Sequence, residues 1–256
     1  MASEHKEQIL DQFTRQAVPF ATAAAIRNAD ALNRIVKMAE AGPDDTVLDV
    51  ACGPGLLACA FARVARHVTG IDLTPAMLEQ ARALQRQQGL ENLTWQEGDV
   101  LPLPYADHSF SIVSTRFAFH HFEDPLAVLK EMRRVCRPGG RVVVADSAPA
   151  AGKADAFNRM ERLRDPSHVR ALSPEELRAL FTEAGLPAPR VQPDLLPGDV
   201  ESFLARSFPR EGDADRIRQI FAESLEHDDL GMAAVRIDGK ICFSFPTLIL
   251  ASTIND

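Results

Sequence analysis

One stretch of the chain, residues 46–61, limits the possible fold more than any other. It begins with residues typical of a short buried strand, continues through a tight loop that contains Gly53 and Gly55, and ends in an apolar helix. Glycine lets the backbone approach a ligand closely, and the first turn of a helix has N–H groups that are free to bind one. A strand, a glycine loop and a helix in this order are typical of a nucleotide-binding site.

The nucleotide that such a loop binds depends on the acidic residues around it. Residues 53–58 match the pattern G-x-G-x-x-A, and Asp72 follows Gly53 by 19 residues, near the place of the ribose-binding acid in dinucleotide folds. However, Asp49 ends the first strand, where a carboxylate can meet a cationic or amino group of the ligand, and Asp99 ends a later one. Acids at successive strand ends are typical of S-adenosylmethionine sites, so this interpretation is favoured over a dinucleotide enzyme.

Longer motifs within residues 45–146 carry a family resemblance. They are residues 47–55, 68–78 and 98–110, and residues 119–122 followed by 137–140. With these motifs the chain resembles class I S-adenosylmethionine-dependent methyltransferases, within the ubiquinone/menaquinone-biosynthesis-like group often called type 11. The family pattern D-x-G-x-G-x-G has Ala51 at its first glycine here, and alanine is small enough to keep the loop close to the ligand. Residues 162–170 are similar to a segment of small bacterial members of the group.

The resemblance implies most of the contacts to the expected cofactor, S-adenosyl-L-methionine. It implies that the Asp72 carboxylate accepts hydrogen bonds from both ribose hydroxyls, and that Asp99 binds the exocyclic amine of adenine. The other implied cofactor-binding residues are Leu73 and Met77 beside the adenine, Val100 on its ring, Asp49, Ala51, Gly53 and Gly55 near the methionine part, and Arg116 through its backbone.

Predicted strands and helices alternate from residue 46 to residue 146, which indicates a parallel sheet with helices on both faces. The expected fold is α/β, a doubly wound, mostly parallel seven-stranded sheet of the Rossmann-like methyltransferase kind. Helices are predicted at 3–16 and 29–41, and in this fold such helices can close over the site. The predicted domains are an N-terminal helical cap (1–45), a cofactor-binding core (46–196), a helical insertion that serves as a substrate lid (197–232) and C-terminal strands that complete the sheet (233–256).

His120 and His121 follow the fourth predicted strand and are the candidates for catalysis. A histidine with a pKa near neutrality can take a proton from a hydroxyl or amine as the methyl group leaves the sulfonium. A similar histidine recurs in family members that act on different acceptors, so His121 can equally serve to position other groups. Many methyl transfers need no base, because the sulfonium is already a good electrophile and positioning then determines the rate.

Aromatic and basic residues are the candidates for binding the methyl acceptor. The chain has 14 Phe but one Trp and one Tyr, which indicates an apolar pocket, and Phe20 and Phe117 are its candidate residues. Either ring can instead belong to the core. Arg164, His168 and Arg170 lie in a basic segment, where they either hold an acidic or carbonyl group of the acceptor or form a solvated helix face.

Composition narrows the possible partners. The net charge of −8 argues against nucleic acid, and no apolar run approaches the roughly 20 residues that span a bilayer. The first ten residues are polar and are not a signal peptide. Four cysteines without C-x-x-C spacing predict reduced core residues in a cytoplasmic protein and indicate no metal site. The expected partner is a small-molecule acceptor, bound by a monomer or homodimer.

The expected function is transfer of a methyl group from S-adenosylmethionine to O, N or C of a small, largely apolar or aromatic metabolite. Two alternatives stay open at this point, a non-catalytic S-adenosylmethionine-binding module and a nicotinamide-dependent dehydrogenase. For a dehydrogenase, the sequence has no recognisable catalytic group beside the position of hydride transfer, because Tyr105 has no lysine four residues further on.

Overall fold

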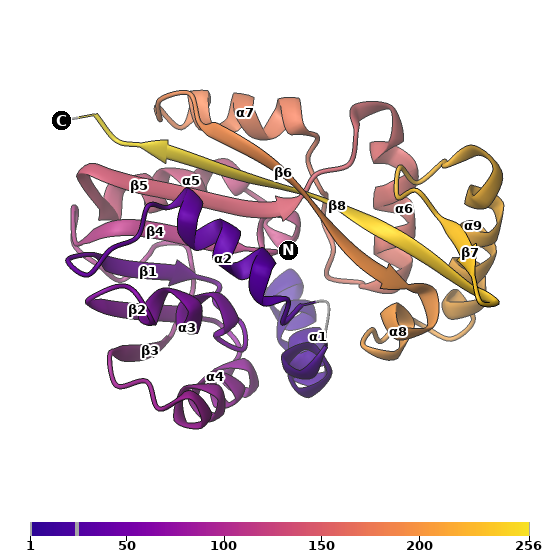
Figure 1. Cartoon of the computed structure of the whole chain (residues 1–256), viewed down its shortest axis with the longest axis horizontal. Helices are drawn as coiled ribbons and strands as arrows, with labels where there is room; N and C mark the ends of the chain where they lie inside the picture. Colours follow the sequence, from indigo (N-terminus) through magenta and orange to yellow (C-terminus); the bar gives the residue numbers. More distant parts are fainter. Residues whose placement is uncertain (1, 24–25, 256) are drawn as a thin grey trace.

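The computed structural model describes residues 2–23 and 26–255 and is built around one mixed sheet (Figure 1). The strand order is β3-β2-β1-β4-β5-β8-β6, with β7 paired to β8 beside this path. The strands are β1 (Thr46–Val50), β2 (His67–Asp72), β3 (Leu93–Glu97), β4 (Phe110–Arg116), β5 (Cys136–Ser147), β6 (Arg190–Asp199), β7 (Val235–Ile237) and β8 (Lys240–Thr253). The strands β1 to β5 pair in parallel, whereas β8 runs antiparallel to both β5 and β6. The predicted α/β fold with a mostly parallel seven-stranded path is confirmed.

Helices cover both faces of this sheet, and further helices pack together at the outer end of β6 and β8. They are α1 (Ala2–Thr22), α2 (Ala29–Met38), α3 (Leu56–Ala62), α4 (Pro75–Gln88), α5 (Pro125–Val135), α6 (Ala154–Arg164), α7 (Pro174–Glu183), α8 (Val200–Ala205) and α9 (Asp213–His227), with short turns η1 (Phe119–His121) and η2 (Ala151–Lys153). Met1, Ala24 and Ala25 of the predicted cap and Asp256 of the predicted C-terminal strands lie outside the described residues.

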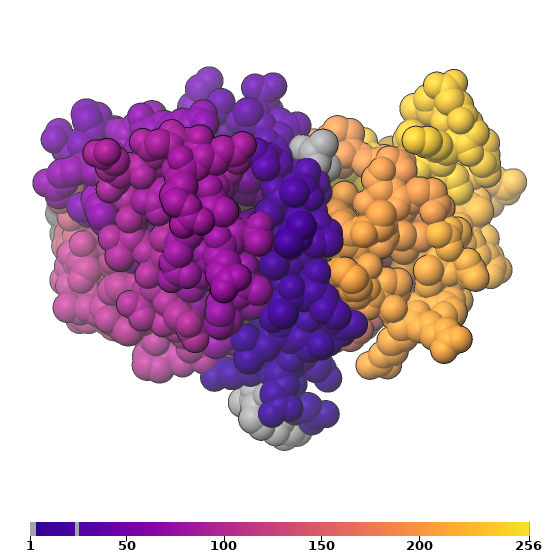
Figure 2. Space-filling model, turned by 90° about the horizontal axis from the view of Figure 1, so that it is seen from below, coloured from indigo at the N-terminus to yellow at the C-terminus, as the bar shows by residue number. Residues whose placement is uncertain are grey.

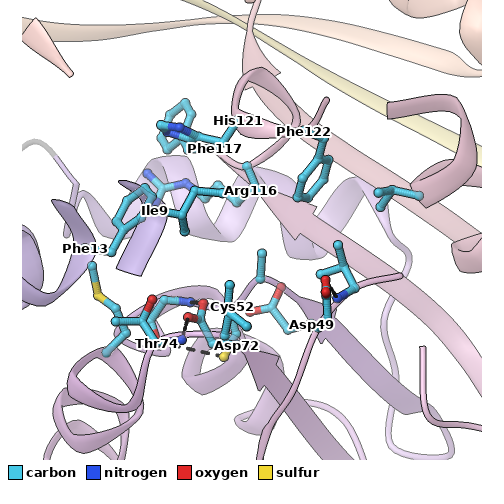
Figure 3. Close-up of a pocket in the computed structure, with 18 of the residues that line it drawn as sticks. Ile9, Phe13, Asp49, Cys52, Asp72, Thr74, Arg116, Phe117, His121 and Phe122 are labelled. Carbon is cyan, nitrogen blue, oxygen red and sulfur yellow. Dashed lines mark hydrogen bonds between the residues drawn. The ribbon is translucent and has the colours of Figure 1, made fainter. Parts of the chain in front are cut away.

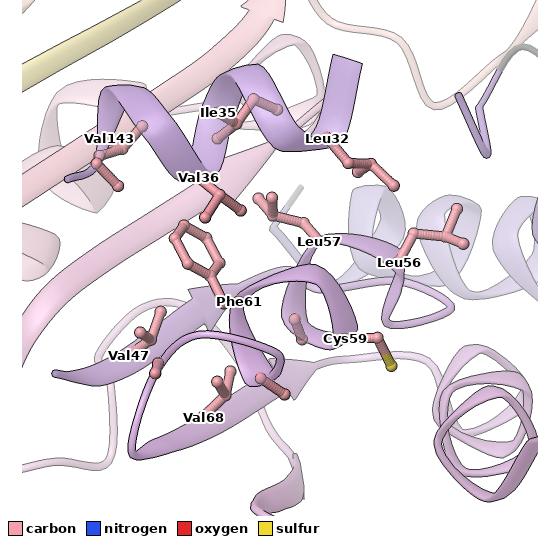
Figure 4. Close-up of a cluster of buried hydrophobic side chains, with 14 of the residues drawn as sticks. Leu32, Ile35, Val36, Val47, Leu56, Leu57, Cys59, Phe61, Val68 and Val143 are labelled. Carbon is pink, nitrogen blue, oxygen red and sulfur yellow. The ribbon is translucent and has the colours of Figure 1, made fainter. Parts of the chain in front are cut away.

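Alternate residues of the central strands enter two different hydrophobic clusters, one on each face of the sheet. Val47 of β1 belongs to the cluster under α2 and α3, whereas Leu48 belongs to the one under α5 and α7. Successive residues of a strand point to opposite faces, so a continuous apolar run is buried on both. Figure 4 shows the first cluster, in which Phe61 of α3 points toward Val36 of α2. The glycine loop is therefore held between a buried strand and a buried helix.

The C-terminal part of the chain builds a third cluster at the far end of β6 and β8 (Figure 1). There α8 and α9, the helices of the predicted insertion, pack against α6 and the outer half of β8. Phe203, Phe221 and Phe243 are buried in this cluster, with ring centroids between 5.0 and 6.3 Å apart. Because β6 continues to Asp199, past the predicted end of the core at residue 196, the insertion is attached to the sheet through two long paired strands.

The first helix is longer than the sequence predicts. Instead of ending at residue 16, α1 continues to Thr22 with Pro19 inside it. Pro19 has no N–H to donate to the carbonyl oxygen of Arg15, so α1 lacks one backbone hydrogen bond at this point. The Thr22 hydroxyl donates to the carbonyl oxygens of Val18 and Pro19, at 2.9 and 3.3 Å, and so satisfies acceptors that the last turn leaves free. Figure 2 shows α1, in indigo, lying between the core in magenta and the insertion in orange.

Truncation of Phe61 to alanine should destabilise the core strongly. Phe61 is completely buried, and removing a buried ring of this size lowers the free energy of unfolding by about 3–5 kcal/mol. Val64→Ala is the matched control, because Val64 lies just after the same helix and is 41% exposed. It should cost less than about 0.5 kcal/mol. Urea unfolding of the three proteins gives both values, and equal losses would contradict the packing of α3 against α2.

Candidate active site

A cavity of about 360 Å³ opens at the carboxyl ends of β1, β2 and β4 (Figure 3). The strand order reverses between β1 and β4, and ligands of open α/β sheets bind at such a point. The predicted site residues that line the cavity are Asp49, Ala51, Gly53, Asp72, Leu73, Met77, Asp99, Val100, Arg116, Phe20, Phe117 and His121. Those that do not line it are Gly55, His120, Arg164, His168 and Arg170.

The Asp72 carboxylate connects two loops of the cavity. One oxygen accepts a hydrogen bond from the backbone N–H of Gly53 at 2.7 Å, and the other accepts one from Thr74 at 2.9 Å. Burial raises the pKa of Asp72, while these two backbone bonds act in the opposite direction. Each carboxylate oxygen has a further lone pair, so the group can still accept hydrogen bonds from a ligand.

Both glycines of the loop have a left-handed backbone, with φ of +52° at Gly53 and +75° at Gly55, but their surroundings differ. A Cβ on Gly53 would meet no atom within 4 Å, so this residue borders open space. A Cβ on Gly55 would lie 2.5 Å from the Trp95 ring and 2.9 Å from the Ala81 Cβ, so packing as well as the backbone conformation requires a glycine there. Ala51, which replaces the first glycine of the family pattern, has a φ of +53°. An alanine in this left-handed region costs roughly 1 kcal/mol relative to glycine.

Asp49 and Arg116 are buried ionisable groups with unused hydrogen-bonding atoms. Ser114 donates to Oδ1 of Asp49 at 3.1 Å, and Nη1 of Arg116 donates to the Ile26 carbonyl at 3.1 Å. Within the described chain, Oδ2 of Asp49 and Nη2 of Arg116 have no partner. Burial raises the pKa of Asp49 to about 7 and lowers that of Arg116 to about 10. A ligand with both an ammonium and a carboxylate would satisfy both atoms.

The first helix covers the cavity. Lys6 of α1 forms an ion pair with Asp99, and Asp99 also accepts hydrogen bonds from the backbone N–H groups of Val100 and Leu101, at 2.7 and 3.3 Å. Further along α1, Phe13 meets the His121 ring edge-on, with 5.0 Å between the ring centroids. Lys6 is not among the predicted site residues, because no motif surrounds it and only the position of α1 brings it to Asp99.

The two neighbouring histidines have opposite properties. His121 lines the cavity, and its Nδ1 lies 3.0 Å from the Ser167 carbonyl oxygen. A carbonyl can only accept, so Nδ1 carries the proton and Nε2 the lone pair. Burial, together with the nearby His120, lowers the pKa of His121 to about 4. The ring is therefore neutral around pH 7.

His120 lies outside the cavity and is bound to Asp146, with 2.5 Å between Nδ1 and Oδ1. Burial alone would lower the pKa of His120, but the charge and hydrogen bond of Asp146 outweigh it and raise that pKa. Asp146 also accepts hydrogen bonds from the N–H groups of Ala118 and Phe119, at 2.9 and 2.8 Å. These bonds hold the preceding Phe117 at a φ of +55°, a strained conformation for a residue with a side chain.

The predicted basic segment does not meet the cavity. Arg170 is exposed and paired with Glu176. His168 is buried, with Nε2 2.7 Å from Oδ1 of Asn158, and burial lowers its pKa. Arg164 is half-buried and paired with Glu161.

Comparison with known proteins assigns the family. Residues 48–144 match the family described as "Methyltransferase domain". The uncharacterized methyltransferase YcgJ of Bacillus subtilis is 34% identical over 210 residues, which cover 81% of this chain and 82% of that protein. The chain belongs to the class I S-adenosylmethionine-dependent methyltransferases. Its cofactor is S-adenosylmethionine, and the predictions of family, enzyme class and cofactor are confirmed.

Other comparisons agree with this family. The crystal structure of YcgJ matches with a TM-score of 0.81 at 28% identity, and the match covers 89% of this chain and 99% of that one. The ubiquinone/menaquinone biosynthesis C-methyltransferase UbiE of Bdellovibrio bacteriovorus is 41% identical over 115 residues, 44% of this chain and 48% of that protein. The 27-O-demethylrifamycin SV methyltransferase of Amycolatopsis mediterranei is 28% identical over 220 residues, 83% of this chain and 76% of that protein. The names of the last two relatives give methylation of different compounds.

The buried carboxyl of Asp49 should give the ligand-free protein a measurable pH dependence. Its folded-state pKa of about 7 lies above the ordinary 3.8, so the stability that the protonated carboxyl contributes is full below 3.8 and is lost as the pH rises through 7. The loss is on the order of 2–4 kcal/mol. The Asp49→Asn variant has no such loss, so its advantage in free energy of unfolding over the wild type should grow with pH.

Urea unfolding without cofactor, at about pH 5, 6.5 and 8, measures this difference over the range in which Asp49 titrates. The depressed pKa of His121 acts in the opposite direction, but it does so in both proteins and cancels from the difference. Asp44→Asn, at an exposed position, is the control and should show no pH-dependent difference. A constant gap between wild type and Asp49→Asn would contradict the raised pKa.

Proposed function

We propose that this methyltransferase transfers a methyl group to an O, N or C atom of a small, largely apolar or aromatic metabolite. The observation that carries the proposal is the division of the cavity lining. Asp49 and Asp72 lie on one wall, whereas Ile9, Phe13 and Phe117 lie on the wall opposite (Figure 3). A charged cofactor and an apolar acceptor therefore have separate surfaces to bind.

The residues of the first wall, together with Arg116 beside Ile9 and Phe117 on the opposite side (Figure 3), fit the groups of the cofactor. In the proposed arrangement, Asp72 accepts hydrogen bonds from the ribose hydroxyls, and Asp99 binds the adenine amine. The methionine part carries an ammonium and a carboxylate, for which Oδ2 of Asp49 and Nη2 of Arg116 offer complementary charge. The remaining proposed contacts are Leu73, Met77 and Val100 around the adenine and the backbone of Ala51 and Gly53 beside the methionine part.

The chain's own part in the reaction is to position the acceptor and exclude water. Bound S-adenosylmethionine supplies an electrophilic methyl group on a sulfonium, so the acceptor's electron pair forms a bond to that carbon while the carbon–sulfur pair stays with sulfur. Holding the acceptor in line with that bond contributes up to about 7–11 kcal/mol to lowering the barrier. The apolar wall provided by α1 and by the segment after β4 shields this position from solvent.

We propose His121 as the base for acceptors that must lose a proton. It lines the cavity, and its Nδ1–H is held by the Ser167 carbonyl, which leaves Nε2 free to accept a proton. Its pKa of about 4 leaves the ring unprotonated around pH 7 and also makes it a weaker base than a histidine with a pKa near neutrality. His120 suits this role less well, because it lies outside the cavity lining and its Nδ1 is bound to Asp146.

The relatives support a small-molecule acceptor but differ in the atom that receives the methyl group. They include a 27-O-demethylrifamycin SV methyltransferase and a ubiquinone/menaquinone biosynthesis C-methyltransferase. A screen with labelled methyl donor over phenols, aryl amines and quinols distinguishes O, N and C transfer. Cofactor binding without transfer to any acceptor would instead support the non-catalytic binding module. The assignment to the methyltransferase family excludes the alternative of a nicotinamide-dependent dehydrogenase.

We further propose a cytoplasmic monomer or homodimer that binds no nucleic acid, with residues 1–45 as a cap and residues 197–232 as a lid. The net charge of −8 disfavours a polyanionic partner. The four cysteines are unpaired, which suits a reducing compartment. Among residues 2–23 and 26–255, no helix is both long and apolar enough to span a membrane.

Replacement of Asp72 by asparagine should weaken binding of S-adenosylhomocysteine by about 10–100-fold, because charged hydrogen bonds to the ribose contribute about 1.5–3 kcal/mol. Calorimetric titration measures the affinity. Asp44→Asn is the matched control at an exposed position and should bind like the wild type. Equal affinity of the wild type and Asp72→Asn would contradict the proposed ribose contact.

Replacement of His121 by glutamine should lower kcat by about 100-fold or more for an acceptor that must lose a proton, with little change in S-adenosylhomocysteine affinity. His120→Gln should mainly lower the melting temperature, because it breaks the buried pair with Asp146.

The pH profile of the wild type gives a second test. Between about pH 8 and 6, protonation of His121 should not lower kcat, because the pKa of His121 is about 4. An unchanged kcat in His121→Gln would show that the reaction needs no base at this position.

A further inference from the structure

A second cavity, of about 70 Å³, adjoins the first on the side of the insertion. Phe13, Phe20, Phe117 and His121 line both cavities and so form the partition between them. The rest of its wall comes from residues of α6, β6, β8 and the C-terminal end of α8, together with Gln16 of α1, Ile26 and His120. Its volume is roughly twice the ~30 Å³ that one water molecule occupies in the liquid, so it has room for a group of a few atoms. It cannot hold a whole metabolite.

Two arginines of this second cavity stack on the same aromatic ring. The guanidinium carbons of Arg164 and Arg206 lie 4.9 and 5.2 Å from the centroid of Phe203. Arg164 donates to the Glu161 carboxylate from Nε at 3.0 Å and from Nη2 at 2.7 Å. Arg206, in contrast, has neither an ion pair nor a side-chain hydrogen bond to any residue in the described part of the chain.

The acidic groups beside Arg206 already have partners. Glu161 is paired with Arg164, and Asp165 accepts hydrogen bonds from Gln16 at 2.9 Å and from the N–H and hydroxyl of Ser167 at 2.9 and 2.6 Å. Burial lowers the pKa of Arg206 to about 10, and the charge of Arg164 acts in the same direction, whereas the charges of Glu161 and Asp199 act against it. Asp199 accepts a hydrogen bond from the N–H of Ser202 at 3.0 Å. Among the described residues, none therefore forms an ion pair or a hydrogen bond with the half-buried Arg206 guanidinium.

From this arrangement we propose that the second cavity binds a carboxylate of the methyl acceptor, with Arg206 as its ligand. The proposal rests on the function proposed above and narrows its acceptor to an aromatic or other apolar carboxylic acid. A guanidinium offers two parallel N–H donors in the plane of a carboxylate, which is the geometry of the strongest pairs of this kind.

The partition between the cavities then determines how the acceptor lies. With its carboxylate at Arg206, the apolar body of the acceptor packs along Phe13, Phe20 and Phe117. Its opposite end reaches the first cavity beside His121, where the methyl group is transferred. The carboxylate is thus the group that is recognised, and the methylated atom lies at the other end of the molecule.

The test compares carboxylic acids with their neutral amides. The probes are 4-hydroxyphenylacetate and its homologues with one and two additional methylene groups, each paired with its primary amide. Binding is titrated by calorimetry in the presence of saturating S-adenosylhomocysteine. For the wild type, at least one acid should bind about tenfold or more tightly than its amide, since the charged hydrogen bonds are lost in the amide. Equal affinity within every pair, or no binding by any acid, overturns the proposal.

Variants then assign the preference to Arg206. In Arg206→Gln the acid should lose its advantage over the amide, and an unchanged advantage overturns the proposal. Arg216→Gln, which alters an exposed arginine of α9, should keep the wild-type preference. Arg206→Lys keeps the charge but not the two parallel donors, so its preference should be intermediate. If Arg206→Gln does not fold, a full wild-type preference in Arg206→Lys overturns the proposal.

The titration with S-adenosylhomocysteine is performed first on every protein. It shows that each variant is folded, and it separates this proposal from the function on which it rests. A wild type that does not bind S-adenosylhomocysteine contradicts the proposed function. A wild type that binds it but shows no preference for acids contradicts only the carboxylate site at Arg206.

Discussion

The cavity depends on a single carboxylate that two backbone N–H groups stabilise. Asp72 accepts hydrogen bonds from Gly53, in the loop after β1, and from Thr74, just before α4. The strands bring it there, because Val50 at the end of β1 pairs with Ile71, directly before Asp72. A buried carboxylate is costly unless it is hydrogen-bonded, so the same two bonds that stabilise Asp72 also fix both loops. The walls on both sides of Asp72 are in this way set by the fold itself.

The positions of the acidic residues could be predicted because they follow from local patterns. Asp49, Asp72 and Asp99 each come at or just after the end of a parallel strand, and the carboxyl ends of such strands meet at one edge of the sheet. The reason for Gly55 could not be predicted in the same way. Its position is filled by the ring of Trp95, a residue of β3. A sequence pattern shows that a glycine is present but not which distant side chain requires it.

The roles of several residues depend on contacts between distant segments and therefore could not be predicted from the sequence. His120 and His121 are equivalent by position, and only the placement of Asp146 in β5 turns His120 into part of a buried ion pair. Arg206 has no motif around it, and its relevance arises because α8 packs at the outer end of β8, next to the partition between the two cavities. The basic segment had the appropriate charge, but its arginines find acidic partners within a few residues, Arg164 with Glu161 and Arg170 with Glu176. An arginine that is already paired is a poor ligand for a further anion.

Because of its length, the helix α1 contributes residues to the walls of both cavities. Ile9, Phe13, Gln16 and Phe20 are spaced by three or four residues, which places them on one face of the helix. Ile9 lines the first cavity, Gln16 lines the second, and Phe13 and Phe20 line both. A helix that ended at residue 16, as the sequence pattern predicts, would not position Phe20 as part of the partition. Because α1 continues past Pro19 to Thr22, a single helical face meets the proposed sites for cofactor and acceptor, and both depend on how that helix is seated.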